Sequence, residues 1–175
     1  MFKDISRFNN IDDYLPILTA ILIVDMIVMI LSISNIISSN YLKVWYQKFF
    51  LSAVLADVLV LFIVVIFARA IYYYIFDTFS ITNFIIVMLA LQITHDILFY
   101  IIFSAIPRGT NKMIDVFKDY ANEVSYGAII GDSMMIIAIG LIASYLANFE
   151  ENTNIIILIV FLYILQFILY NFLIY

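Results

Sequence analysis

The residues of this chain that could do chemistry are acidic and polar side chains set inside long apolar segments. An ionisable group at the depth of a bilayer core costs a few kcal/mol even on lenient insertion scales, so each such group is a candidate for function. Carboxylates and an imidazole can relay protons or bind hard cations. Six side chains interrupt the apolar runs in this way: Asp25, Asp57, Gln92, His95, Asp96 and Asp132.

The composition assigns these segments to a membrane. The chain has 175 residues, of which 66% are hydrophobic and 12% charged, whereas soluble domains are about 45–50% apolar and about 25% charged. The absence of cysteine excludes thiolate metal sites, disulfides and thiol redox chemistry. A net charge of −5 without a basic run argues against nucleic acid as a partner.

The apolar runs predict an all-α polytopic bundle in one domain covering residues 1–175. Each run has about the 20 residues that a helix needs to cross a bilayer, and none alternates with period two as a membrane β-barrel strand does. The link at 40–48 carries Trp45 and Tyr46, which suit the lipid headgroup region. The predicted spans are 14–38, 49–73, 82–106, 125–148 and 154–175.

Residues 111–124 have a different pattern. Met113, Val116, Phe117, Tyr120 and Val124 recur at helical spacing among charged residues, which predicts an amphipathic helix on the bilayer surface. Three basic residues in and before it are predicted to lie at that surface: Arg108, Lys112 and Lys118. The excess of basic residues on this side places the N-terminus outside and the C-terminus in the cytoplasm by the positive-inside rule.

The four aspartates are expected to form one layer. With a rise of 1.5 Å per residue, they fall within about 6 Å of the same depth, near the middle of the membrane. The fourth span also carries small residues that allow close helix contact in lipid, so we expect it to pack centrally. The glycines expected to mediate this packing are Gly127, Gly131 and Gly140.

Three functions are compatible with these features, and a proton or cation channel or transporter leads. In it, Asp25, Asp57, Gln92, His95, Asp96 and Asp132 line the pathway; the sequence requires no cofactor but allows a cation bound by the aspartates. The second is a structural membrane scaffold whose acids are neutral or hydrogen-bonded. The third is an intramembrane aspartyl hydrolase, which Gly131-Asp132 only partly supports, so we favour a protein that is not an enzyme.

One third of the chain, from Gln92 to Ala147, resembles a multi-pass membrane family of nucleocytoplasmic large DNA viruses. The resemblance rests on Gln92-Ile-Thr-His95-Asp96, Pro107-Arg108-Gly109-Thr-Asn111-Lys112-Met113, Phe117-Lys118-Asp119-Tyr120-Ala121-Asn122-Glu123 and Gly131-Asp132-Ser133. It implies a viral source, a place in a virion's internal membrane and support for the scaffold function. The expected partners are the lipid bilayer, a second copy of the chain, or a capsid or membrane protein docking on residues 107–123.

Overall fold

The long apolar segments fold into helices in the computed structural model, which describes residues 2–171. Helix makes up 80% of the structure, and the described part of the chain contains no strand. Five helices are long and apolar enough to cross a membrane, which confirms the predicted all-α membrane bundle. The elements in order are η1 (Ile11–Asp13), α1 (Tyr14–Ile33), α2 (Asn40–Phe49), α3 (Leu51–Ile75), α4 (Ile81–Ala105), α5 (Lys112–Val124), α6 (Gly127–Leu146) and α7 (Glu151–Asn171).

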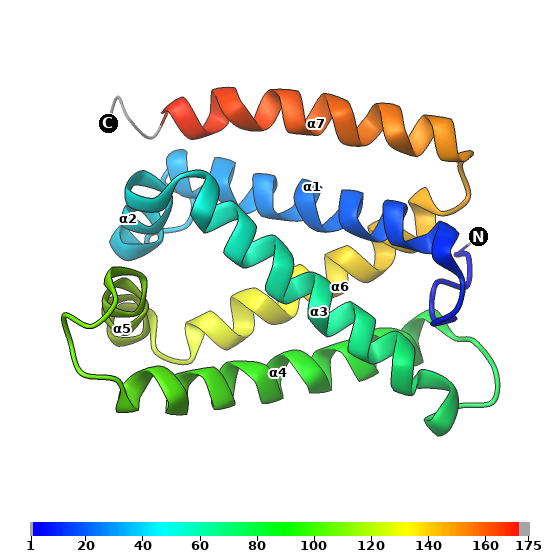
Figure 1. Ribbon diagram of the computed structural model, residues 1–175, viewed down its shortest axis with the longest axis horizontal. Helices are drawn as coiled ribbons and strands as arrows, with labels where there is room; N and C mark the ends of the chain where they lie inside the picture. Colours follow the sequence, from blue (N-terminus) through cyan, green and yellow to red (C-terminus); the bar gives the residue numbers. More distant parts are fainter. Residues whose placement is uncertain (1, 172–175) are drawn as a thin grey trace.

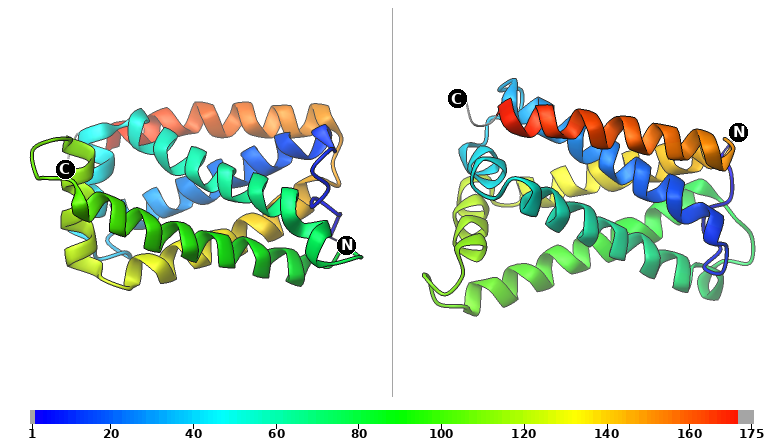
Figure 2. Two further views of the ribbon diagram at one scale, coloured as in Figure 1. Left: turned by 60° about the horizontal axis from the view of Figure 1, so that its bottom comes forward. Right: turned by 45° about the horizontal axis from the view of Figure 1, so that its top comes forward.

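The five spans run side by side along the long axis, and the two short helices lie across one end (Figures 1 and 2). The N-terminal segment lies at the opposite end of the bundle (Figure 1). The first span is shorter than predicted because Asn35 takes a left-handed conformation (φ 58°), and the N–H of Ile36 bonds back to the carbonyl of Leu31. Residues 172–175, which the prediction placed in the fifth span, lie outside the described part.

The two transverse helices are built alike. The predicted surface helix at 111–124 is confirmed as α5, whereas residues 40–48, interpreted as a link, form α2. Each helix ends at a residue with positive φ, Phe50 (45°) after α2 and Ser125 (51°) after α5, and the chain then turns into α3 or α6. The transverse helices pack on each other, so together they cover one end of the bundle.

Helix α1 occupies the centre of the bundle. It packs against α3, α6 and α7, and 61% of its most apolar stretch is buried, against 33% for α6. The expectation that the fourth span is the central one is therefore wrong, although α6 does pack on both α1 and α4. Helix α7 lies at the edge beside α1 (Figure 1).

Only one of the three predicted packing glycines makes a close helix contact. A methyl group on Gly140 would lie 2.7 Å from Met88 Cε and 2.8 Å from Ile85 Cγ1, so α6 approaches α4 there through the missing side chain. A methyl group on Gly131 would meet no atom within 4 Å, and one on Gly127 would meet only Val124 of the preceding helix. The Gly127/Gly131 pair is thus not a packing motif within the described chain, because Gly131 is exposed and Gly127 faces only the end of α5.

The N-terminal segment closes the other end of the bundle. Residues 2–13 fold back so that Ile5 is fully buried, and the main chain of Lys3 bonds to Ser144 in α6 through its N–H (3.2 Å) and its carbonyl (2.5 Å, from Ser144 Oγ). These two bonds anchor the N-terminal segment to α6, the fourth span.

Candidate functional site

The four intramembrane aspartates lie toward the end that α2 and α5 cover. Counting 1.5 Å per residue from that end of each helix, Asp132 is about 8 Å deep, Asp57 about 9 Å, Asp25 about 12 Å and Asp96 about 14 Å. Their depths therefore agree within about 6 Å. This layer is closer to the α2 and α5 end than the expected mid-membrane position. The reason is that α3 and α6 each begin two residues later in the sequence than the predicted spans.

Two of the aspartates hold α2 in place. Tyr46 donates its hydroxyl hydrogen to Asp25 Oδ1 at 2.9 Å, and Trp45 Nε1 donates to Asp57 Oδ2 at 2.9 Å. Both aromatic side chains are buried, so their predicted place among lipid headgroups is wrong. The Trp45 and Tyr46 side chains point into the bundle, where they supply hydrogen-bond donors to the buried carboxyl groups of Asp57 and Asp25.

Asp96 belongs to a polar group within α4. Gln92 Nε2 donates to Asp96 Oδ1 at 2.7 Å, and His95 Nδ1 lies 3.2 Å from the same oxygen. Gln92 is buried, while the His95 side chain keeps 35% of its surface exposed. The imidazole stacks on Phe99, which in turn meets Phe117 of α5 edge to face. The polar group is thus in contact, through Phe99, with the transverse helix.

Asp132 and Tyr120 complete the cluster. Asp132 lies within electrostatic range of Asp96 and Asp57, and Asp57 is likewise within range of Asp25, so the four carboxyl groups form one interacting set. Tyr120 of α5 lies over them. Burial raises the pKa of its phenol, and the negative charges of Asp132 and Asp57 raise that pKa further. We call Asp25, Asp57, Asp96 and Asp132 the acid cluster.

The acid cluster has almost no compensating charge. Within residues 2–171, His95 is the only basic side chain that forms an ion pair with any of its members. Three buried oxygen atoms also lack a hydrogen-bond partner in the described structure, namely Asp25 Oδ2, Asp96 Oδ2 and Gln92 Oε1. Four ionised carboxylates cannot coexist in such a site, so the arrangement is suited to holding protons or admitting a cation.

The described residues contain no preformed metal-binding site. No group of three or more His, Cys, Asp or Glu side chains in the described residues is arranged to bind a metal ion. The aspartates come from four different helices, and two of them already accept hydrogen bonds from Trp45 and Tyr46. Carboxylate oxygen remains the donor type that a hard cation would use.

The predicted surface cations are engaged within the chain. Arg108 Nη2 binds Asp119 Oδ1 at 2.8 Å, and Lys118 Nζ donates to the carbonyl of Ile106 at the end of α4. Lys112 at the start of α5 is exposed. Two of these three basic residues therefore fasten the α4–α5 connection.

Sequence reasoning missed the residues that complete the site from the transverse helices, Trp45, Tyr46 and Tyr120. A signal was available for the first two, because polar atoms of Trp and Tyr find partners when buried, and α2 has a clear amphipathic pattern. Comparison with known proteins adds no homologue: no family model, curated protein or solved structure matches this chain.

Proposed function

We propose that the protein takes up protons or small cations at the acid cluster, from the membrane face that α2 and α5 cover. One observation carries the proposal. Asp57, Asp96 and Asp132 come from three separate spans, yet Asp132 lies within electrostatic range of both Asp57 and Asp96, and His95 is the only basic side chain of the described chain paired with them. Such a group binds positive charge readily.

Side chains beside the acid cluster include groups that can transfer a proton. His95 and Asp96 share a contact at 3.2 Å, and an imidazole can accept a proton at one nitrogen while it donates from the other. Tyr120, on the surface helix α5, is within electrostatic range of Asp132, Asp57 and Asp96 and provides a hydroxyl group. The route would enter beside α5 and reach Asp132 first, because it is the shallowest of the four acids from that end.

The opposite direction is blocked by apolar packing. Ile21, Val65 and Ile136 lie beyond Asp25, Asp57 and Asp132 on their respective helices and are fully buried. Beyond them, residues 2–13 close the end of the bundle. Transport through the membrane therefore requires these side chains to separate after a proton or cation has entered the acid cluster from the α2 and α5 side.

Ion flux into liposomes tests the proposal. We expect wild-type protein to dissipate a proton or potassium gradient, and Asp96→Asn/Asp132→Asn to reduce this flux about tenfold or more, because it removes two carboxyl groups of the acid cluster. Asp77→Asn, an exposed acid in the α3–α4 loop, is the matched control and should leave flux unchanged. Wild-type flux equal to that of empty vesicles would refute transport.

A structural scaffold is the second candidate, and a different observation favours it. The Tyr46–Asp25 and Trp45–Asp57 hydrogen bonds fasten α2 to α1 and α3, so two of the four acids already have a structural use. The viral family resemblance, a virion internal membrane, a capsid or membrane protein partner and a second copy of the chain all belong to this candidate. The N-outside orientation, inferred from the basic residues, is likewise a proposal.

A further inference from the structure

Two neighbouring side chains of α4 each keep one buried oxygen atom without a hydrogen-bond partner in the described structure. These atoms are Gln92 Oε1 and Asp96 Oδ2. Gln92 is only 2% exposed, and its amide is aimed at Asp96, because Nε2 donates to Asp96 Oδ1 at 2.7 Å. Leaving buried acceptors without a donor is costly, so a hydrogen atom shared by these two oxygens would stabilise the site.

A single proton on Asp96 would satisfy both oxygens. A carboxylic acid has one O–H donor and one carbonyl acceptor, and a primary amide has N–H donors and a carbonyl acceptor, so the two groups can form a ring with two hydrogen bonds. The first of these bonds is present, from Gln92 Nε2 to Asp96 Oδ1. A proton on Oδ2 supplies the second, to Gln92 Oε1.

The nearby nitrogen atoms make Oδ2 the oxygen that receives the proton. His95 Nδ1 lies 3.2 Å from Asp96 Oδ1, so Oδ1 faces two nitrogens, one from His95 and one from Gln92. Oδ2 has no donor within residues 2–171. A proton added to Oδ2 therefore displaces no existing hydrogen bond.

The charges around Asp96 also favour the neutral acid. Helix α4 packs against α3, α5 and α6. These helices bring Asp132 and Tyr120 within electrostatic range of Asp96, and Asp57 and Glu123 within range of Tyr120. None of these four side chains is basic, and His95, on α4 itself, is the one basic group of the described chain paired with Asp96. Repulsion among carboxylates is relieved when one of them binds a proton.

A metal cation fits the same place less well. Mg²⁺ and Ca²⁺ bind about six to eight oxygen atoms, and no group of three or more His, Cys, Asp or Glu in the described residues is placed to begin such a shell. Asp96 is also the deepest of the four acids from the α2 and α5 end. One turn beyond Gln92, Met88 is fully buried and apolar, so the polar region ends at this pair.

We propose that Gln92 and Asp96 form a proton-binding pair, in which Asp96 Oδ2 carries the proton and donates it to Gln92 Oε1, and that the ion taken up by the acid cluster is a proton. The inference rests on the proposed uptake function and names its ion. Loading adds one proton and one positive charge, which converts the Asp96 carboxylate to a carboxylic acid and breaks no other bond. Release returns the same proton.

Infrared spectroscopy of the protein in detergent near pH 7 tests the pair without requiring transport. A protonated Asp96 has a carboxylic acid C=O band that shifts in heavy water, and Asp96→Asn should remove it. Gln92→Leu should shift or remove the same band, because the acid loses both hydrogen bonds with the amide. Thr94→Val, which takes an exposed hydroxyl from the same helix, is the control and should leave the band unchanged.

Stability supplies a second readout of the same pair. Asp96→Asn offers Gln92 the donor and the acceptor of the protonated acid, so it should be at least as stable as wild type. Asp96→Leu offers neither and should lower the folding equilibrium constant about tenfold or more in unfolding by sodium dodecyl sulfate. An acid band unaffected by Asp96→Asn or by Gln92→Leu, or equal destabilisation by Asp96→Asn and Asp96→Leu, would overturn the proton-binding pair.

Flux into liposomes separates this inference from the proposed function. Vesicles with a pH-sensitive dye report protons, and parallel vesicles with a potassium-sensitive dye report a metal cation. We expect wild-type protein to dissipate the proton gradient and to leave the potassium gradient intact. Potassium flux equal to proton flux would overturn the proton assignment while cation uptake stands. Absence of both fluxes would instead refute uptake, and the infrared bands would still decide whether the pair holds a proton.

Discussion

The two ends of the bundle treat buried charge in opposite ways. At the N-terminal end, Asp13 is fully buried, and it lies 3.6 Å from Arg69 and 3.9 Å from Lys3 while accepting a hydrogen bond from Asn10 at 2.7 Å. At the α2 and α5 end, His95 is the only basic side chain of the described residues within ion-pair distance of the four carboxyl groups. The buried acid at one end thus lies beside two cations, whereas the clustered acids at the other end have a single histidine.

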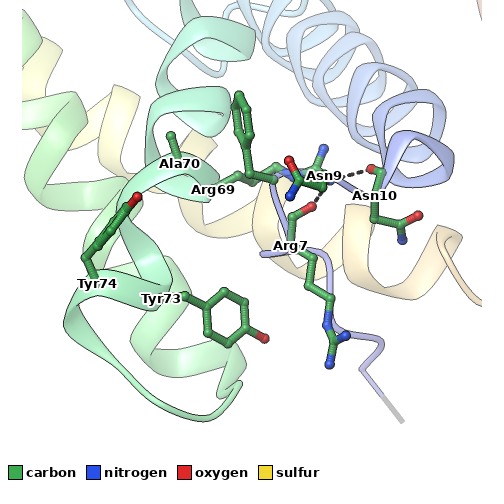
Figure 3. A pocket seen from close by; sticks show the side chains of 8 residues that line it. Arg7, Asn9, Asn10, Arg69, Ala70, Tyr73 and Tyr74 are labelled. Atoms are coloured by element: carbon green, nitrogen blue, oxygen red, sulfur yellow. Dashed lines mark hydrogen bonds between the residues drawn. The ribbon is translucent and has the colours of Figure 1, made fainter.

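This difference separates a structural use of charge from an exchangeable one. A buried ion pair fixes a local structure, and removing one of its partners is costly. Arg69 donates to the carbonyl oxygens of Arg7 and Asn10 (Figure 3), so the Asp13–Arg69 pair holds the N-terminal segment in place. An uncompensated acid cluster gains nothing comparable from remaining charged, and it is the better candidate for binding a proton or a cation.

The largest expected effect is at the closed end. Arg69→Met leaves Asp13 buried with Lys3 as its only cation and frees two carbonyl groups, so we expect about 3–5 kcal/mol of destabilisation. Unfolding by sodium dodecyl sulfate from mixed micelles measures it. Arg7→Met, the same substitution at a largely exposed arginine, should have a much smaller effect, because an exposed ion pair contributes little. Equal effects would remove the distinction between the ends.

The double variant Arg69→Met/Asp13→Asn sharpens this comparison. If an uncompensated carboxylate causes most of the loss, neutralising it should restore part of the stability. If the loss instead comes from the freed carbonyl groups, the double variant should be no more stable than Arg69→Met.

A smaller effect is expected where α2 meets the acid cluster. Tyr46→Phe removes the donor to Asp25 Oδ1, and because Asp25 Oδ2 has no partner in the described structure, the loss should be about 1–3 kcal/mol. Tyr41→Phe on the same helix is the control and should change stability by less than about 0.5 kcal/mol. Equal stability of Tyr46→Phe and wild type would mean that the hydrogen bond does not anchor α2.

The helices were the predictable part of this structure. Long apolar runs specify membrane helices because no water is present to satisfy an unpaired backbone, and the 3.6-residue spacing of 111–124 specifies a surface helix. The common depth of the aspartates also follows from residue counts, since helical rise is constant. Local rules suffice for all three.

Side-chain partners across the bundle were not predictable, for a physical reason in each case. Trp45 and Tyr46 are amphipathic and suit either a headgroup or a buried carboxylate, and only the fold of α2 selects between these. Gly131 and Gly140 have the same residue type, but only Gly140 faces another helix. Ile5 is buried because residues 2–13 return to Ser144, a contact across nearly the whole chain.

The smallest expected effect lies between the two transverse helices, where an acid has ample partners. Glu123 of α5 accepts hydrogen bonds from Ser39 Oγ (2.6 Å) and from the N–H groups of Asn40 (2.8 Å) and Tyr41 (3.0 Å), at the start of α2. Burial acts to raise the pKa of this carboxyl, but the bonds from Ser39, Tyr41 and Asn40 outweigh it and lower the pKa. The carboxylate also lies favourably at a helix N-terminus.

A lowered pKa gives this contact a defined pH dependence. The stabilisation should be complete above the ordinary glutamate pKa and should disappear as the pH falls through the lowered native value, because both states are then protonated. Glu123→Gln should therefore lower stability by about 1 kcal/mol or less near pH 7, since the side chain is exposed, and by nothing measurable near pH 2. Thermal unfolding in detergent across this range measures the difference, with Glu150→Gln, an exposed acid whose carboxylate accepts no hydrogen bond within residues 2–171, as the control. A loss in Glu123→Gln that persists unchanged in acid would mean that side-chain shape, rather than the carboxylate charge, joins α5 to α2.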